Sequence, residues 1–458
     1  MRLAYGLGAG PFGIKDNGLS YLLLIFYNQA LGLPAATVGL IIMVALIVDA
    51  LTDPLIGHLS DRTRSRLGRR HPWMLGAILP TAAAVALLWN PPAGLGEEGL
   101  ALWCLVLTLA VRLFAGAFEV PNAAMVAELA RDYHLRTRML ALRQLFGWSF
   151  GILAGMSAFG IFLAERPGGG GVSDPAGYGA YGLAAAAAMA LLMALSSLGT
   201  LRPLAEVAPP APAAGRGAAG PALAALARNR PFLVVLGAGL FTAMTSGLSA
   251  ALNVYLNTYL WGLSPARISL LVSSAFFGAL LAAALAPALA RRLEKRGGAL
   301  ALLGLVAVAV PAPPLLWLGG LMPTGRPDLL LGLLYAATIV QVTAAVGAAI
   351  LAGSMLADTV EVTELASGRR AEGLTFAAYG FTNKAVSGVG VFASGIVLSI
   401  AGLSDQTRPG AVPEPVLVRL VLLYAGLVVV LVGTAALLLA RYPITAAAHR
   451  RTLAALGR

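Results

Sequence analysis

Apolar segments long enough to cross a lipid bilayer recur about twelve times along this 458-residue chain. A membrane-spanning helix needs about 20 mostly apolar residues. Because backbone groups inside lipid must bond to one another, we expect each segment to form an α-helix. The predicted spans are 5–32, 36–59, 72–92, 99–128, 138–164 and 178–201, followed by 232–261, 265–290, 298–321, 328–356, 371–402 and 415–440.

Composition excludes the ordinary soluble classes. Hydrophobic residues make up 59% of the chain and charged residues only 11%, whereas about a quarter of the residues in a soluble domain are charged. The net charge of +12 would indicate a nucleic-acid partner in a soluble protein, but here the arginines cluster in short loops between apolar segments. We therefore predict a lipid bilayer around the chain and no nucleic-acid partner. The single cysteine, Cys104, excludes an intramolecular disulfide framework.

The basic loops predict the orientation of the chain, because lysines and arginines gather on the cytoplasmic side of a membrane. The basic loops follow every second span, whereas the loops 33–37 and 90–99 contain no lysine or arginine. We therefore predict a multi-pass protein of the cell (inner) membrane with both termini in the cytoplasm. The residues predicted to serve these cytoplasmic loops or gating are Asp61, Arg62, Arg69 and Arg70 after the second span, and Asp358, Glu361 and Arg370 after the tenth.

A stretch rich in proline, alanine and glycine, 202–230, divides the chain into predicted halves 1–201 and 231–458. The halves show a weak repeat, in which Met125 to Glu128 resembles Met355 to Asp358. Two related six-helix halves are typical of secondary transporters. The predicted fold is an all-α membrane protein of twelve helices in two pseudo-symmetric halves. The sequence contains no P-loop motif, which argues against ATP hydrolysis, and we predict no enzyme activity.

Two carboxylates lie inside the second apolar span. Asp49 and Asp53 are four residues apart, so a helix places them on one face. Buried together, they must share a proton or bind a cation. Pro54 leaves the carbonyl of residue 50 without its helical donor, and the Thr52 hydroxyl offers another oxygen of the kind a hard cation takes. The alternative interpretation is a helix that ends at Pro54, with the acids capping it or exposed to solvent.

Further ionisable residues lie within the predicted spans. Charges facing lipid are costly, so we expect these side chains to face a shared interior. The alternative, an anchor that reaches the membrane surface, applies best to Arg143 and Lys15. The residues are Lys15 and Asp16 in the first span, Arg112 and Glu119 on one face of the fourth, Arg143 in the fifth and Lys384 in the eleventh.

These residues stand in motifs that cover nearly the whole chain. The motifs are Tyr5-Gly-x-Gly8 to Lys15-Asp16, Asp49-x-x-x-Asp53-Pro54-x-x-Gly57 to Gly68-Arg-Arg-x-Pro72-Trp73, Glu119-Val-Pro121, and Met355-Leu-Ala-Asp358-x-x-Glu361 to Gly368-Arg-Arg370-Ala-Glu372-Gly373, leading into Lys384. Together they resemble the glycoside–pentoside–hexuronide:cation symporters of the major facilitator superfamily, the melibiose permease-like group. The combination is specific, whereas any one motif alone is weak.

The resemblance implies roles for individual residues. Asp49 and Asp53 fall on the family's cation site, with Thr52 beside them and Lys384 matching an associated lysine. If the cation is sodium, the two aspartates are its metal ligands. The positions that match sugar-hydroxyl ligands of the family are Lys15, Asp16, Glu119 and Arg143.

The chain also departs from the family pattern. Glu119 replaces an aspartate, and Ala115 and Gly116 replace a tyrosine–threonine pair that includes a hydroxyl near the cation. Ala123 replaces a tryptophan that stacks on the sugar, and Arg112 is a possible additional binding residue with no counterpart in the pattern. These differences imply a wider, less aromatic pocket with fewer ligands for sodium.

We therefore predict a secondary active transporter that works as a monomer and without a cofactor. It would couple a glycoside or similar polyhydroxyl solute to Na⁺ or H⁺ by alternating access, with Lys384 pairing with the aspartates in turn. Two alternatives on the same fold are a cation-coupled lysophospholipid transporter, as in related animal members, and an uncoupled facilitator. A non-transporting scaffold is disfavoured, because it has no use for buried charges in several helices.

Overall fold

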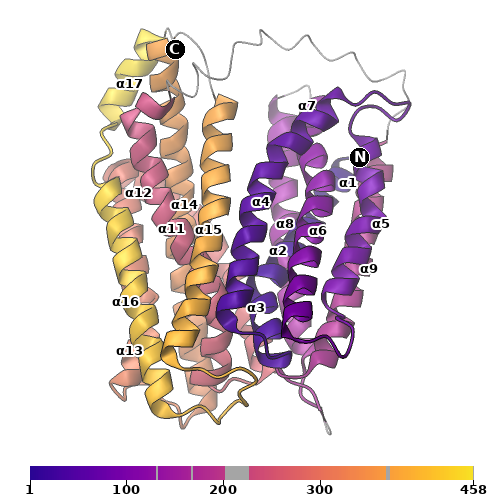
Figure 1. Ribbon diagram of the computed structural model, residues 1–458. Coiled ribbons are helices and arrows are strands. Elements are labelled where there is room, and N and C mark those ends of the chain that lie inside the picture. Colours follow the sequence, from indigo (N-terminus) through magenta and orange to yellow (C-terminus); the bar gives the residue numbers. More distant parts are fainter. Residues whose placement is uncertain (130–132, 167–168, 202–225, 368–371, 457–458) are drawn as a thin grey trace. The chain divides into compact units, whose positions relative to one another are not determined.

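The computed structural model describes residues 1–458 except 130–132, 167–168, 202–225, 368–371 and 457–458 (Figure 1). In the described part, the regular secondary structure is helical apart from one isolated bridge between Arg166 and Gly169. The elements, with η marking π-helices, are α1 (Arg2–Leu7), α2 (Gly10–Asn17), η1 (Gly18–Leu22), α3 (Leu23–Ile25), η2 (Phe26–Ala30), α4 (Ala35–Arg62), α5 (His71–Leu88), α6 (Glu97–Ala124), α7 (Val126–Leu129), α8 (Tyr133–Ser157), η3 (Ala158–Phe162), α9 (Pro175–Thr200), α11 (Arg230–Tyr255), η5 (Leu256–Leu260), α12 (Pro265–Ala309), α13 (Ala312–Leu318), α14 (Pro327–Ser367), α15 (Glu372–Ala401), α16 (Glu414–Leu439) and α17 (Ala446–Ala455).

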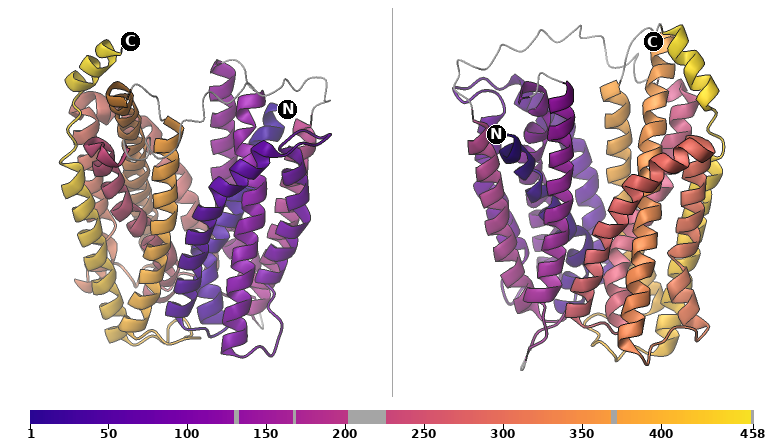
Figure 2. Two further views of the ribbon diagram at one scale, coloured as in Figure 1. Left: turned by 45° about the horizontal axis from the view of Figure 1, so that its top comes forward. Right: turned by 180° about the vertical axis from the view of Figure 1, so that it is seen from behind.

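The predicted spans correspond to helices. Among the described residues, 10 helical stretches are long and apolar enough to cross a membrane. The first predicted span is absent from these because α1 to η2 divide it into short α and π segments. The stretch Pro265–Leu318 covers two predicted spans. The basic loop expected at 290–298 is instead a break at one residue, Glu294, whose φ of 59° interrupts α12 (Figure 2).

The chain forms two compact units. Unit 1 comprises Met1–Pro210, Gly247–Ser273 and Val391–Val416, and unit 2 comprises Ala211–Ser246, Ser274–Gly390 and Leu417–Arg458. The predicted linker 202–230 lies mostly outside the described residues, so the division of the chain at that stretch stays a prediction.

Within unit 1, neighbouring helices pack in pairs. α4 packs on α6, α6 on α5, and α5 on α9, while α2 packs on α8 (Figure 1). The α2–α8 contact is very close: a methyl group built on Gly13 would lie 2.0 Å from the carbonyl oxygen of Gly147. Only glycine fits there, so the glycines near the start of the chain allow α2 and its charged residues to lie against the bundle.

Unit 2 contains α14 and parts of α11, α12, α15 and α16, whose other parts belong to unit 1, and one short helix that the sequence analysis missed. α17 packs against the end of α14. Its ten residues include a histidine and two arginines among alanines, so no apolar span of membrane length indicated it. α14 continues to Ser367, eleven residues beyond the predicted span, and this extension holds Asp358 and Glu361.

Candidate functional site

The paired carboxylates lie on one continuous helix. α4 runs from Ala35 to Arg62 with Pro54 inside it, so the helix does not end at Pro54 as the alternative interpretation required. The Asp49 side chain is only 1% exposed, while Asp53, one turn further, is half-buried. The Thr52 hydroxyl donates to the backbone oxygen of Asp49 at 3.1 Å.

Helix α6 supplies a cation to this pair. Nη1 of Arg112 donates to Oδ2 of Asp49 at 3.0 Å, and the Arg112 side chain is 2% exposed. One turn further along α6, a methyl group built on Gly116 would lie 3.2 Å from Oδ1 of Asp53 and 3.9 Å from Oδ1 of Asp49. The two carboxylates therefore converge on the surface of α6, with a guanidinium on one side and a bare glycine on the other.

A second ion pair joins α2 to α6. Nζ of Lys15 lies 3.2 Å from Oε2 of Glu119, with the two side chains 2% and 24% exposed. Asp16 follows Lys15 and is half-buried. The chain changes from α-helix to the π-helix η1 two residues later, and π segments often occur at functional sites. The structure thus brings Lys15 and Glu119 together, with Glu119 the more accessible partner.

Arg143 reaches the same helix from α8. Its Nη1 donates to Oδ1 of Asn122 at 2.6 Å, and Nδ2 of Asn122 donates to the Ser196 hydroxyl at 3.1 Å. Asn122 is fully buried and lies one turn beyond Glu119 on α6. Sequence reasoning missed Asn122, although a polar residue next to the Glu119-Val-Pro121 motif was a usable signal.

Lys384 lies on α15 in unit 2 and is half-buried. Its backbone oxygen accepts a hydrogen bond from the Ser387 hydroxyl at 2.8 Å. Because Asp49 and Asp53 belong to unit 1, the predicted pairing of Lys384 with them stays a prediction.

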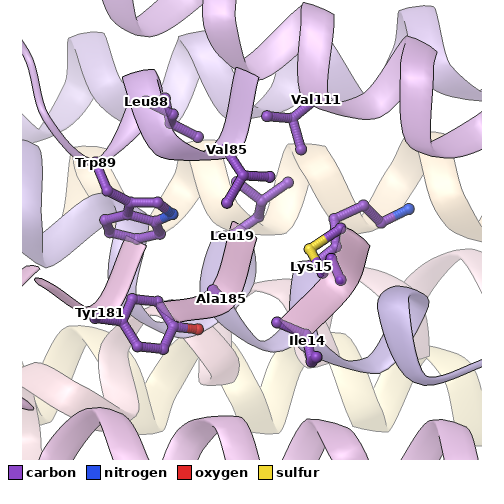
Figure 3. A pocket seen from close by; sticks show the side chains of 11 residues that line it. Ile14, Lys15, Leu19, Val85, Leu88, Trp89, Val111, Tyr181 and Ala185 are labelled. Atoms are coloured by element: carbon purple, nitrogen blue, oxygen red, sulfur yellow. The ribbon is translucent and has the colours of Figure 1, made fainter. Parts of the chain in front are cut away.

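A small cavity opens beside Lys15 in unit 1. Figure 3 shows its lining, which is apolar except for the lysine and the ends of two aromatic side chains, Trp89 and Tyr181. The Lys15 stem borders the cavity while its ammonium group points away from the aromatic pair (Figure 3) and toward Glu119. The aliphatic stem of Lys15 therefore packs against apolar side chains, while its ammonium group forms an ion pair with Glu119 on α6.

Near the start of α4, an amide network forms that the sequence analysis missed. It consists of Asn28, Gln29, Tyr255, Tyr259 and Asp405, all in unit 1. Nδ2 of Asn28 donates to Asp405 at 2.6 Å and to the backbone oxygen of Leu33 at 2.8 Å. Oδ1 of Asn28 accepts from the Tyr255 hydroxyl at 2.9 Å and from Gln29 at 2.6 Å.

The Gln29 side chain also uses its full hydrogen-bonding capacity. Its Nε2 donates to Asn28 and, at 3.3 Å, to the backbone oxygen of Ser404. Its Oε1 accepts from the Tyr259 hydroxyl at 3.0 Å and from the backbone N–H of Thr407 at 2.9 Å. Both amides are 1% exposed. Segments more than 200 residues apart in sequence are thus joined by two amides whose hydrogen-bonding capacity is fully used.

At the other end of α4 lies a charged cluster of Asp61, Arg69, Arg70 and Glu128. Oε1 of Glu128 accepts a hydrogen bond from Nε of Arg69 at 2.8 Å and forms an ion pair with Arg70, whose Nε lies 2.8 Å away. Arg70 also lies 3.4 Å from Asp61. Arg62, predicted with this group, is exposed at the end of α4.

Unit 2 has a related arrangement. Nζ of Lys295 lies 2.6 and 2.8 Å from the two carboxylate oxygens of Asp358, and His449 on α17 lies 2.5 Å from Glu361. Asp358 and Glu128 occupy matching places in the weak sequence repeat. Each forms an ion pair with a basic side chain from the stretch that precedes it in sequence. Arg370 lies outside the described residues.

Comparison with known families decides the identity of the chain. Residues 4–446 match the family model described as MFS/sugar transport protein. The chain belongs to this family. The match confirms both the resemblance drawn from the motifs and the all-α fold of the major facilitator superfamily, and it makes the chain a multi-pass membrane transporter, not an enzyme.

Several curated relatives are symporters or sugar transporters. An isoprimeverose transporter of Lactiplantibacillus pentosus is 25% identical over 401 residues, 88% of this chain and 80% of that protein. An uncharacterized symporter of Synechocystis sp. is 40% identical over 157 residues, 33% of this chain and 28% of that protein. A sodium-dependent lysophosphatidylcholine symporter of Danio rerio is 27% identical over 169 residues, 36% of this chain and 31% of that protein. The match covers less than a third of the length of each of the last two proteins.

Solved structures share the fold at low identity. The inward-open xylose transporter XylE from E. coli gives a TM-score of 0.65 at 12% identity, covering 99% of this chain and 98% of that one. A bacterial homolog of the human lysosomal transporter Spinster gives 0.65 at 15% identity, covering 99% and 97%. At these identities the likeness shows the fold alone.

Proposed function

We propose that this transporter carries a glycoside or a similar polyhydroxyl solute together with a monovalent cation, Na⁺ or H⁺, by alternating access. The observation that carries the proposal is the joining of α2, α4 and α6 by two ion pairs, Lys15–Glu119 and Asp49–Arg112. The transporter works as a monomer in the cell inner membrane with both termini in the cytoplasm, needs no cofactor and binds no nucleic acid.

The polar groups suit a solute rich in hydroxyls. Carboxylates accept hydrogen bonds from hydroxyl groups, and lysine and arginine donate to them. Glu119 is the exposed member of its ion pair, at 24% against 2% for Lys15, so Lys15 holds the carboxylate and Glu119 presents it. Asp16 and the Arg143–Asn122 pair add an acceptor and donors nearby. Of the three relatives described above, the one with the longest match is an isoprimeverose transporter.

The carboxylates of α4 suit a coupling site. Asp49 and Asp53 converge on Gly116, and two neighbouring carboxylates in a low-dielectric interior favour a cation or a proton between them. The relatives named as symporters support the transport of a solute together with a second species. We place the cation at α4 and the solute at α2, α6 and α8. Lys384 would exchange with the cation at Asp49 and Asp53.

Alternating access also needs gates that open in turn. The amide network fastens the start of α4 to the segments around Tyr255 and Asp405. The predicted topology places this end outside the cytoplasm, so we assign the network to the outer gate. The charged cluster around Glu128 lies at the predicted cytoplasmic end and serves the inner gate.

A lysophospholipid is the second candidate solute. The similarity to a sodium-dependent lysophosphatidylcholine symporter of Danio rerio and the small side chains at 115, 116 and 123 favour it, because an acyl chain needs room. A lipid would need only one charged anchor, whereas a sugar needs several paired groups, since each buried unpaired polar group costs about 1–3 kcal/mol. The set of charges here favours the polyhydroxyl solute. An uncoupled facilitator would not need Asp49 and Asp53.

The test is a binding titration of the purified transporter against a glycoside panel that includes isoprimeverose and a lysophosphatidylcholine panel. Glu119→Gln should weaken glycoside binding by about ten- to a hundredfold, equivalent to about 1–3 kcal/mol. The matched control is Glu98→Gln, which changes an exposed residue at the start of α6 and should bind normally. Ala123→Trp should be tolerated by glycosides and should block a lipid tail. Binding of lysophosphatidylcholine alone, lost in Ala123→Trp, would replace the sugar proposal with the lipid one.

A further inference from the structure

We infer that Arg112 determines the cation selectivity of the coupling site: its guanidinium, fixed on Asp49, takes the place that a sodium ion would need, so Na⁺ is excluded. This inference rests on the proposed function in one respect, that Asp49 and Asp53 form the coupling site. It goes further by rejecting one of the two ions and by giving a role to a residue that the family pattern does not explain.

The contact between Arg112 and Asp49 is a buried ion pair. Nη1 of Arg112 and Oδ2 of Asp49 are 3.0 Å apart, and the two side chains are 2% and 1% exposed. The Nε of Arg112 is buried without a hydrogen-bond partner among the described residues. The pair with Asp49 is therefore the described contact that offsets the desolvation of this guanidinium, and breaking it to admit another cation would leave a buried charge uncompensated.

The remaining surroundings offer few oxygens to a hard cation, which binds through several oxygen ligands. On the α6 side, Gly116 faces both carboxylates and Ala115 is buried beside it, and neither has a side-chain oxygen. On α4, the backbone oxygen of Asp49 already accepts from the Thr52 hydroxyl. One carboxylate oxygen of Asp49 is taken by Arg112, so the ligand set is smaller than two aspartates suggest.

Electrostatics act in the same direction. A sodium ion on Asp49 would lie about 4 Å from the guanidinium, and at the effective dielectric of a partly buried site this repulsion weakens binding on the order of a thousandfold. Lys15 is a second buried cation that interacts electrostatically with both Asp49 and Arg112. With Na⁺ excluded, H⁺ is the one of the two proposed ions that remains.

Sodium itself is the probe. The purified full chain is unfolded by heat while NaCl replaces choline chloride at constant ionic strength. The wild type should show no change in Tm. Arg112→Ala removes the guanidinium and leaves two converging carboxylates, so it should gain a saturable rise in Tm of several degrees at sodium concentrations about a hundredfold above Kd. Should this variant fail to fold, Arg112→Gln, which keeps a donor for Asp49, takes its place.

Two controls separate the charge from the shape. Arg112→Lys keeps a buried cation and should stay insensitive to sodium. Asp49→Asn combined with Arg112→Ala removes both charges and should also show no response. A saturable, sodium-specific rise in the wild type would overturn the inference, and so would a folded Arg112→Ala or Arg112→Gln variant that remains insensitive to sodium. The titration contains no solute, so a failure to transport glycosides would leave it valid, and sodium binding by the wild type would leave the glycoside proposal standing.

Discussion

At the two ends of α4, a helix about 42 Å long at 1.5 Å per residue, polar side chains fasten the chain in opposite ways. The amide network at the start is centred on two neutral amides that are 1% exposed, and one of them donates to the carboxyl group of Asp405. The charged cluster at the end uses ions, and Glu128 is 32% and Asp61 56% exposed. Separating buried hydrogen-bonded amides costs free energy because each group loses its partner. Separating exposed ions costs less because water already solvates them. We therefore expect the network to resist opening more strongly than the cluster.

The largest effect is expected from Asn28→Ala. The change deprives Tyr255, Gln29, Asp405 and the Leu33 carbonyl of one partner each. Because each buried group left unpaired costs about 1–3 kcal/mol, opening should become easier by on the order of a hundredfold. The measurement is maleimide labelling of a Thr258→Cys reporter, since Thr258 is 3% exposed, in a Cys104→Ala background.

The matched control for that experiment is Asn90→Ala. Asn90 is an exposed amide that donates to the backbone oxygens of Ala86 and Gly179. Its removal should leave reporter labelling unchanged. Equal acceleration by both substitutions would show that the amide network has no special role.

A smaller effect is expected from Glu128→Gln. The change removes the ion-pair partner of Arg69 and Arg70, and a partly exposed ion pair contributes about 1 kcal/mol at most. The Tm should fall by about one degree at low salt. At high salt the difference from wild type should shrink because exposed charges are screened, while the Asn28→Ala effect should persist. Glu98→Gln is the control. A salt-independent loss in Glu128→Gln would contradict the contrast between the two ends.

The smallest effect concerns pH at the amide network. Partial burial raises the pKa of Asp405, the hydrogen bond from Asn28 lowers it, and Glu97 raises it further. Because the net pKa is raised, the closed network binds a proton more readily than the open one. Lowering the pH from the raised pKa through the ordinary value should therefore stabilise the closed network, and raising the pH should remove that gain.

Reporter labelling across the acidic range measures this effect, normalised to an exposed Glu98→Cys reference. Asp405→Asn, whose amide oxygen still accepts from Asn28, should remove the pH dependence. Slower labelling at high pH than at low pH would contradict the sign.

Sequence alone was sufficient for the long helices and for placing Asp49 and Asp53 on one helix face, because hydropathy and the helical repeat are local signals. It also placed Lys15 and Glu119 in one polar cluster, through the family motifs. It could not supply the Asp49–Arg112 or Asn28–Asp405 contacts, since these partners lie 63 and 377 residues apart. The interruption at Glu294 was expected as a loop, because charged residues break the apolar pattern there, but that pattern does not show that helix continues on both sides of a single residue. The short helix α17 was missed because it is too short to form an apolar span.

The central claim is tested most directly by solute uptake into proteoliposomes under separately imposed gradients. The account predicts that a pH gradient, inside alkaline, drives accumulation of a glycoside, and that Asp53→Asn abolishes accumulation while solute exchange survives in part. A sodium gradient at matched pH should drive none; if it does, the role given to Arg112 is wrong and cation coupling stands. Equilibration without accumulation under either gradient, unchanged in Asp53→Asn, would contradict cation-coupled symport.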